Sequence, residues 1–260
     1  MRVAALVVAG ALSMFVNDSR ATECKAASGP GTAVLVELYT SEGCSSCPPA
    51  DRWLSSLGGK NQVPGRVVPL ALHVDYWDYI GWKDPYAKRE FSLRQRKLSQ
   101  LQKMALVYTP QVVLQGRDFR GWGTPAFDAA VAKITAQPAR ASISLAVRQS
   151  GGRVLQVEAA AELLDQAQKA DAALYLAAYE NRLSSRVTAG ENRGRTLTLD
   201  YEVLECQGPF AFGPGGQLLE RRELALLPRA TPGTSGVVGF VQNRRTAEVL
   251  QALMLPACPG

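Results

Sequence analysis

The sequence predicts an α/β domain over residues 32–138, followed by an all-β domain over residues 139–260. Three observations support this prediction. In the first part, apolar runs of strand length alternate with helix-like segments in the order β-α-β-α-β-β-α. In the second part, glycine turns separate short alternating runs. The two patterns meet at Gln137 and Pro138, so we expect a domain boundary there.

The composition excludes several classes of protein. The 260 residues are 47% hydrophobic and 20% charged, which excludes low-complexity disorder. No apolar run reaches the roughly 18 residues of a membrane helix, so we expect no membrane span in the mature chain. His73 is the single histidine, which excludes a histidine-rich metal site. It lies inside an apolar run, and we expect a core histidine with satisfied hydrogen bonds rather than a ligand.

Residues 1–21 have the features of a signal peptide. Arg2 precedes an apolar segment of the usual length, and Ser19 and Ala21 place small residues at positions −3 and −1 of a cut after Ala21. We therefore predict that residues 1–21 are removed and that the mature protein is periplasmic or secreted.

The first predicted strand, residues 34–39, leads into a C-x-x-C motif. Cys44 and Cys47 open a helix, because Pro48 and Pro49 stand where the amide hydrogens of the first turn need no partner. At a helix N-terminus the unpaired amides and the helix dipole stabilise a thiolate. We therefore predict that Cys44 is the partly exposed nucleophile and that Cys47 is the resolving thiol.

A C-x-x-C motif alone fits half of a zinc site, a structural disulfide or a redox pair. Zinc would need two further ligands, and only His73 and distant cysteines are available, so we predict no metal site. The order of strand, C-x-x-C helix and later X-Pro strand favours a redox pair.

Two carboxylates compete for the role of proton acceptor when Cys47 becomes a thiolate. Glu37 lies in the strand before the motif. Asp75 follows the second predicted strand, residues 67–74, and alternation directs it to the same end of the sheet. The alternative is that each carboxylate is only hydrogen-bonded in a polar loop.

An aromatic loop covers residues 75–82. Its rings either cap the sheet and pack between the domains, or form an apolar wall beside Cys44. In the second case Tyr76 and Trp77 contact a bound peptide.

A cationic segment, Lys83–Lys103, follows this loop. Its apolar residues fall near helical spacing, so we expect the cations on the solvated face of a helix rather than on a surface for an anionic partner. Nucleic acid is not expected as a partner, because the chain has no recognisable binding motif. A strand at residues 111–115 and a helix at residues 124–136 complete the first part.

The second part is predicted to be an antiparallel β-sandwich of immunoglobulin-like size. Residues 142–147 alternate clearly, and a glycine turn follows them. The loop at residues 190–195 is polar and lacks a nucleophile, so we expect a hairpin tip or an interface loop. The other predicted strands cover residues 154–160, 172–179, 197–204, 218–227 and 236–241.

Five cysteines in an exported protein favour disulfides, with one thiol left over. Cys44 and Cys47 can pair locally. Cys206 and Cys258 both lie in the second part and are the predicted structural disulfide, although a pairing of Cys24 with Cys258 stays open.

Long segments of the sequence resemble a known family. They are ELYTSEGCSSCPPAD at residues 37–51, HVDYWDY at residues 73–79 with GWKDP at residues 81–85, and YTPQ at residues 108–111. These segments look like the DUF1223 family of exported proteins, which has no assigned biochemical role.

The first part also resembles the thioredoxin superfamily over residues 32–138. This resemblance implies a thioredoxin-like α/β fold and a cis peptide bond before Pro110. It further implies that Thr109 and Pro110 line a substrate groove beside Cys44 and Cys47.

The predicted function is therefore an exported thiol–disulfide oxidoreductase that exchanges disulfides with protein or peptide substrates and needs no cofactor. One alternative is a copper(I)-handling protein with Cys44, Cys47 and His73 as ligands, since soft thiolates suit Cu(I). The other alternative is a non-catalytic adaptor that binds a partner.

Overall fold

The computed structural model describes residues 23–58, 65–150, 153–228 and 233–258. The predicted signal peptide, residues 1–21, lies outside the described residues. Of the described residues, 44% lie in strands and 19% in helices. Within this part of the chain, no helix combines the length and the hydropathy that crossing a bilayer requires.

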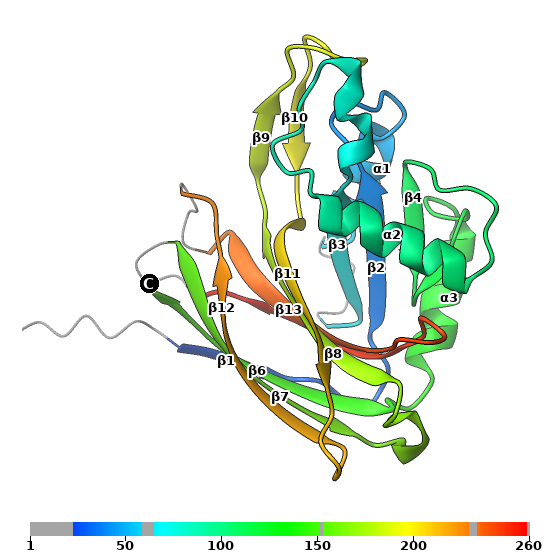
Figure 1. Ribbon diagram of the computed structural model, residues 1–260, viewed down its shortest axis with the longest axis vertical. Coiled ribbons are helices and arrows are strands. Elements are labelled where there is room, and N and C mark those ends of the chain that lie inside the picture. Colours follow the sequence, from blue (N-terminus) through cyan, green and yellow to red (C-terminus); the bar gives the residue numbers. More distant parts are fainter. Residues whose placement is uncertain (1–22, 59–64, 151–152, 229–232, 259–260) are drawn as a thin grey trace, which may run out of the picture.

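A large sheet forms the centre of the molecule, with two smaller sheets beside it (Figure 1). The large sheet has eight strands, in the order β14 (Val249–Pro256), β13 (Ser235–Asn243), β8 (Ala172–Glu180), β11 (Glu202–Ala211), β3 (Val67–His73), β2 (Val34–Thr40), β4 (Gln111–Leu114) and β5 (Arg117–Asp118). The second sheet has the order β1 (Glu23–Ala27), β6 (Ala141–Ser150), β7 (Val154–Leu163) and β12 (Gln217–Ala225). The third is a separate hairpin of β9 (Leu183–Arg186) and β10 (Thr196–Leu199).

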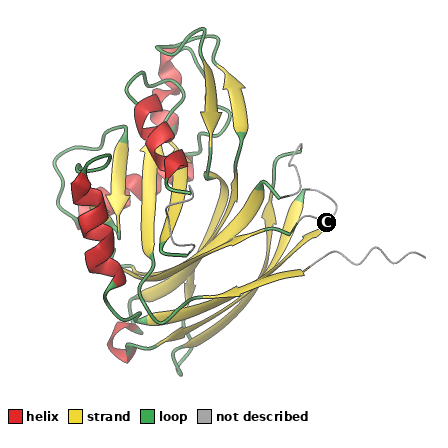
Figure 2. Cartoon of the chain, turned by 180° about the vertical axis from the view of Figure 1, so that it is seen from behind, coloured by secondary structure: helices red, strands yellow, loops and turns green. Residues whose placement is uncertain are grey.

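The helices gather around the β2, β3 and β4 end of the large sheet, and strands make up the rest (Figure 2). They are α1 (Pro48–Ser56), α2 (Arg89–Leu101), α3 (Pro125–Thr135) and the 3₁₀ helix η1 (Asp75–Ile80). A second 3₁₀ helix, η2 (Gln166–Gln168), lies away from them between β7 and β8 (Figure 2).

The predicted fold class, an α/β domain followed by an all-β sandwich, is wrong. The structure is mostly strand, and strands from both parts of the chain share one sheet. The join is the parallel pairing of β11 with β3, where Glu202 lies opposite Ala71. A strand edge exposes unpaired N–H and C=O groups, and β11 covers that edge of β3. Sequence periodicity identifies strands but does not show which distant strand pairs with which edge.

Strand β2 is buried on both faces. Val34, Val36 and Leu38 pack with α1 and α3, whereas Leu35 and Tyr39 pack with α2. Burial on both faces explains why this strand is a continuous apolar run without alternation. It also places the residues that follow β2 between two layers of helices.

A second core lies between the smaller four-stranded sheet and the β8, β13 and β14 part of the large sheet. Ile143 and Leu145 of β6 pack there with Leu174 and Leu176 of β8. The intervening residue Tyr175 faces the core around α2 instead. Strand β8 therefore belongs to both cores.

The predicted disulfide between Cys206 and Cys258 is wrong. Cys24 pairs with Cys258, with Cα atoms 5.6 Å apart. Strand β1 contacts β14, which brings these cysteines together although 234 residues separate them. Cys206 is an unpaired thiol on β11, and burial raises its pKa to about 11.

Candidate functional site

Cys44 and Cys47 lie in the connection from β2 to α1. Cys47 is the N-cap residue of α1, and Pro48 takes the first helical position as the sequence predicts. The carbonyl oxygen of Cys47 accepts hydrogen bonds from the backbone N–H groups of Ala50 and Asp51. Cys44 and Cys47 form a disulfide, with Cα atoms 5.4 Å apart.

Both cysteines are fully buried, with 0% exposure. The expected partial exposure of Cys44 is therefore wrong. Ser45 and Ser46, between the cysteines, are exposed, and the hydroxyl oxygen of Ser46 lies 3.3 Å from the sulfur of Cys44. A substrate would meet these serines before it met either sulfur atom.

The tip of the β9–β10 hairpin covers the C-x-x-C loop. The side-chain amide of Asn192 donates to the carbonyl oxygens of Glu42 and Cys44, each at 2.9 Å. The carboxylate of Glu191 accepts from the backbone N–H of Ser45, also at 2.9 Å. Asn192 is completely buried. The sequence predicts only a hairpin tip or interface loop here, because residues 148 positions apart leave no local signal of contact.

Ile80 of η1 fits between the C-x-x-C loop and the hairpin. A Cβ atom added to Gly43 or to Gly190 would lie 3.0 Å from the Cδ1 atom of Ile80. Gly190 also has a φ of +71°, which side chains rarely adopt. Both loops therefore need glycine where they meet Ile80.

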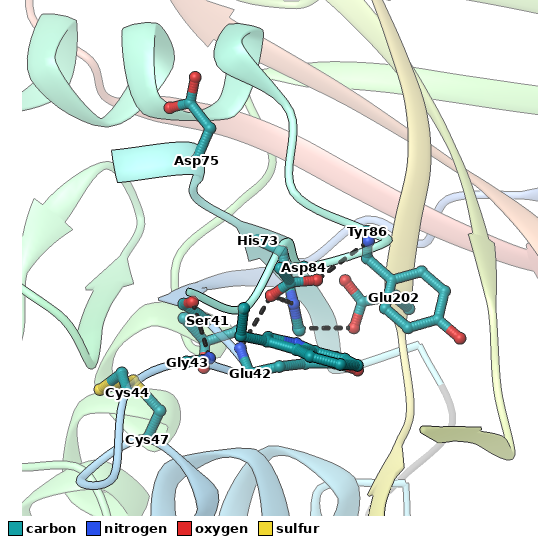
Figure 3. A network of polar contacts seen from close by, with 12 residues as sticks. Ser41, Glu42, Gly43, Cys44, Cys47, His73, Asp75, Asp84, Tyr86 and Glu202 are labelled. Atoms are coloured by element: carbon teal, nitrogen blue, oxygen red, sulfur yellow. Dashed lines mark hydrogen bonds and ion pairs between the residues drawn. A yellow bond between two sulfur atoms is a disulfide. The ribbon is translucent and has the colours of Figure 1, made fainter. Parts of the chain in front are cut away.

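His73 is the centre of a buried network of charged groups (Figure 3). Its Nδ1 atom lies 2.6 Å from a carboxylate oxygen of Asp84, and its Nε2 atom lies 3.0 Å from a carboxylate oxygen of Glu202. Asp84 also accepts the backbone N–H of Glu42 at 2.8 Å, so the network is bonded to the loop that carries Cys44. His73 is therefore a core residue, as expected, with a hydrogen bond at Nδ1 and an ion-pair contact at Nε2.

The network shifts the pKa values of its members. Burial disfavours the imidazolium, but Asp84 and Glu202 raise the pKa of His73 well above its usual value. Burial also opposes charge on Asp84, yet His73 lowers the pKa of that carboxyl group. Burial raises the pKa of Glu202 to about 7, and burial together with Asp84 raises the pKa of Glu42. The network therefore holds one carboxyl group, Glu202, whose pKa lies near neutral pH.

Asp51 is a buried carboxyl group in the first turn of α1. It lies one helical turn after Cys47, and the hydroxyl of Thr40 donates to its carboxylate at 2.7 Å. Burial raises the pKa of Asp51 to about 6. The sequence prediction missed this residue, although positions four apart in a helix share a face and the Cys47-to-Asp51 spacing carries that signal.

Glu37 is not part of this arrangement. Arg94 of α2 donates to both of its carboxylate oxygens, at 2.6 and 3.1 Å. Burial opposes the charge on Arg94, but Glu37 raises the pKa of the guanidinium. Because side chains alternate along a strand, Glu37 lies on the opposite face of β2 from Thr40 and Asp51.

Asp75 also faces elsewhere. Its carboxylate accepts from the hydroxyl of Ser92 in α2, and its backbone N–H donates to the same hydroxyl oxygen at 3.1 Å. Figure 3 shows the side chain of Asp75 well away from Cys44 and Cys47. The structure brings neither predicted proton acceptor to the disulfide.

Some of the residues predicted to contact a substrate also contact one another. The Thr109–Pro110 peptide bond is cis. The indole N–H of Trp77 donates to the hydroxyl of Thr109 at 2.6 Å, whereas the hydroxyl of Tyr76 donates to Gln95. Tyr79 stacks on Trp77 with ring centroids 6.5 Å apart and is 82% exposed. The aromatic loop therefore both packs on the sheet and presents an exposed ring.

Among the described residues, no group of three or more His, Cys, Asp or Glu side chains is placed to hold a metal ion. Both ring nitrogens of His73 face carboxylates. His73 is therefore not free to join Cys44 and Cys47 as a copper ligand.

Comparisons with known proteins give a family and two similar structures. A family model described as "Protein of unknown function (DUF1223)" matches residues 35–242. A crystal structure of a protein from Agrobacterium tumefaciens is 26% identical, with a TM-score of 0.60 over 88% of this chain and 96% of that one. HBP35 of Porphyromonas gingivalis has a TM-score of 0.65 at 15% identity, over 89% of this chain and 76% of its own, and at that identity it indicates the fold alone. The comparison with curated proteins finds no significant match.

Proposed function

The chain belongs to the DUF1223 family, and we propose that it acts as an exported thiol–disulfide oxidoreductase through Cys44 and Cys47. The observation that carries this proposal is the disulfide at the N-terminus of α1, one helical turn from a buried carboxyl group whose pKa is raised to about 6. A carboxyl group with that pKa can both give and take a proton near neutral pH.

The proposed exchange has two steps. A substrate thiolate attacks the sulfur of Cys44, the Cys44–Cys47 bond breaks, and its electron pair stays on the sulfur of Cys47. Cys47 takes a proton from the carboxyl group of Asp51. A second substrate thiolate then attacks the substrate sulfur of the mixed disulfide, and Cys44 leaves. The substrate is oxidised to a disulfide by two electrons, and the cysteine pair is reduced to two thiols; the reverse reaction follows the same path.

Helix α1 supports the assignment of Cys44 as the attacked sulfur. Cys47 is the N-cap residue and is followed directly by the first turn, whereas Cys44 lies in the loop before it. After reduction, the helix dipole stabilises a thiolate at the N-terminus of α1 by at most about 2 kcal/mol. Limited alkylation of the reduced protein is therefore expected to label Cys44 before Cys47.

Exchange requires a movement, because both sulfur atoms are fully buried. The cover is the hairpin tip, which is bonded to the C-x-x-C loop by Asn192 and Glu191. Separation of this tip from the loop would open the face of Cys44. Tyr76, Trp77, Thr109 and Pro110 are the proposed contacts for the substrate chain, and the exposed ring of Tyr79 supports an apolar surface beside them.

The test is to trap the intermediate with the full mature chain. In reduced Cys47→Ser, the Cys44 thiolate is expected to attack a peptide disulfide, expel one peptide thiolate and hold a mixed disulfide with the other half, because no resolving thiol remains. Cys44→Ser is the matched control and should trap far less. Equal trapping by both variants, or trapping only through Cys47, would contradict the assigned roles. Cys206→Ser in both backgrounds removes the unpaired thiol from the readout.

The complete burial of the disulfide favours a second candidate function, a non-catalytic adaptor in which Cys44–Cys47 only stabilises the start of α1. In that case the double variant Cys44→Ser, Cys47→Ser keeps the biological activity and loses stability alone. The oxidoreductase proposal predicts that the double variant is inactive at unchanged fold.

A further inference from the structure

Three arginines lie at the tip of the β9–β10 hairpin. They are Arg186, Arg193 and Arg195, and we call them the arginine tip. All three are exposed, and within the described part of the chain none of them forms an ion pair with a carboxylate. The acidic residue beside them, Glu191, is bonded to the backbone N–H of Ser45. The tip therefore carries a net positive charge, although Glu191 stays ionised beside the arginines.

The hairpin holds these arginines in a fixed place. Arg186 lies directly opposite Thr196 in the β9–β10 pairing, next to Arg195 in sequence. The other face of the hairpin is buried, where Val187, Leu197 and Leu199 pack with Trp82 and Tyr86. A strand buries one face and exposes the other, so the packing directs the side chain of Arg186 to solvent. Arg193 and Arg195 are exposed in the loop between the two strands.

The same hairpin covers the disulfide. Asn192 and Glu191 lie in the segment that contains Arg193, and they bond to the C-x-x-C loop. The hairpin is also a separate two-stranded sheet without strand pairing to the large sheet (Figure 1). A molecule bound to the arginine tip would therefore be attached to the element that has to move before Cys44 can react.

We propose that the arginine tip docks an acidic segment of the protein substrate of Cys44–Cys47. This inference rests on the proposed oxidoreductase function and adds the class of substrate. Arginine forks match carboxylates in geometry and charge. Exposed charges attract a partner over about 8 Å at physiological salt, so the effect is on the rate of association.

The test compares three thiol peptides that differ only in the residues flanking one cysteine, which are acidic, neutral or basic. Each peptide reacts with the oxidised full chain carrying Cys206→Ser, and opening of Cys44–Cys47 is followed by alkylation and mass. The acidic peptide is expected to react about ten-fold faster than the basic one at low ionic strength. The difference should nearly vanish in about 1 M salt, where the screening length is about 3 Å.

The variant Arg186→Ser, Arg193→Ser, Arg195→Ser is expected to reduce the acidic-to-neutral rate ratio to about one. The matched control Arg117→Ser, Lys133→Ser, Arg153→Ser removes the same charge from exposed positions elsewhere and should keep the ratio of the parent. An equal loss of preference in both triple variants would overturn the assignment, because net charge alone would then explain it.

Three further outcomes separate the docking inference from the proposed function. Absence of exchange with any peptide and with dithiothreitol would refute the proposed function itself. Exchange at equal rates with all three peptides would overturn only the docking inference. Loss of binding to phosphatidylglycerol vesicles in the arginine-tip variant, together with equal peptide rates, would overturn it in favour of a lipid surface.

Discussion

Asp51 is the residue that gives the proton in the proposed exchange. Its pKa of about 6 lies above the ordinary 3.8 because the carboxyl group is buried. The native state therefore binds this proton more tightly than the unfolded chain does. The stability that the group contributes is greatest below pH 3.8 and is lost as the pH rises through 6.

Asp51→Asn is expected to stabilise the oxidised protein at pH 7, by up to about 3 kcal/mol, because it removes a buried charge and keeps an acceptor for Thr40. The gain should disappear near pH 4. It should also slow disulfide exchange at pH 7, since no proton can be given to Cys47. Urea unfolding at both pH values and exchange rates with dithiothreitol measure the two effects. A slower exchange with no change in the pH dependence of stability would contradict the raised pKa.

His73 stabilises the fold rather than reacting. His73→Ala would leave Asp84 and Glu202 as buried carboxyl groups without a cation, at an expected cost of about 3–5 kcal/mol. Denaturant unfolding measures this loss of stability. Arg117→Ala is a surface control and is expected to change stability by less than about 0.5 kcal/mol. A loss as small as that of the control would show that the network is not charged.

At the residue scale, the sequence identifies the two cysteines more readily than the residues that contact the buried carboxylates. Cys44 and Cys47 follow from a local motif, and the cis bond before Pro110 is implied by the family resemblance. Asp51 also has a local signal, the helical spacing from Cys47. The partner of Glu37 has none, because Arg94 lies 57 positions away and only the packing of α2 brings it to β2.

The β9–β10 hairpin is the element that controls access to the disulfide. Asn192→Ala removes two hydrogen bonds from the hairpin to the C-x-x-C loop, each worth about 1 kcal/mol net. Reduction of Cys44–Cys47 by dithiothreitol is therefore expected to become up to about thirty-fold faster. The measurement is the rate of thiol appearance at limiting reductant.

Asn243→Ala is the matched control for this change. Asn243 is also buried and hydrogen-bonded, but its partners include Gln168 and Arg245, away from the hairpin tip. It is expected to leave the reduction rate unchanged. An unchanged rate in Asn192→Ala would mean that the disulfide opens without separation of the hairpin.

Elements near the disulfide are predictable from the sequence, and those farther along are less so. The expected strand at residues 34–39 and helix at 124–136 differ from β2 and α3 only at their ends. The expected strand at residues 197–204 is instead the end of β10 and the start of β11. Tyr201, with a φ of +60°, separates them, and an aromatic residue gives no sequence signal of a positive φ.

The whole molecule is joined through non-local pairings. The β11–β3 pairing and the Cys24–Cys258 disulfide connect segments far apart in the chain. Periodicity predicts neither, since it reports the faces of one element and not its neighbours. For the same reason the sequence indicates a site built from the first part alone, whereas Asn192 and Glu202 come from the second.

Cys24→Ser, Cys258→Ser is expected to destabilise the protein by about 2–5 kcal/mol, because the disulfide restricts nearly the whole unfolded chain. Exchange at Cys44–Cys47 should persist at temperatures where the variant is folded. Thermal unfolding under non-reducing conditions measures the loss, and Cys206→Ser is the control. Loss of exchange in the folded variant would mean that the two disulfides are coupled.

The reduction potential of Cys44–Cys47 tests the central claim most directly. The full mature chain carrying Cys206→Ser is equilibrated with a series of dithiothreitol ratios, and alkylation with mass detection reports each disulfide separately. The account predicts a potential clearly above about −300 mV for Cys44–Cys47, with Cys24–Cys258 at a lower value. A potential for Cys44–Cys47 below about −300 mV, equal to that of Cys24–Cys258, would identify it as a structural disulfide and contradict the account.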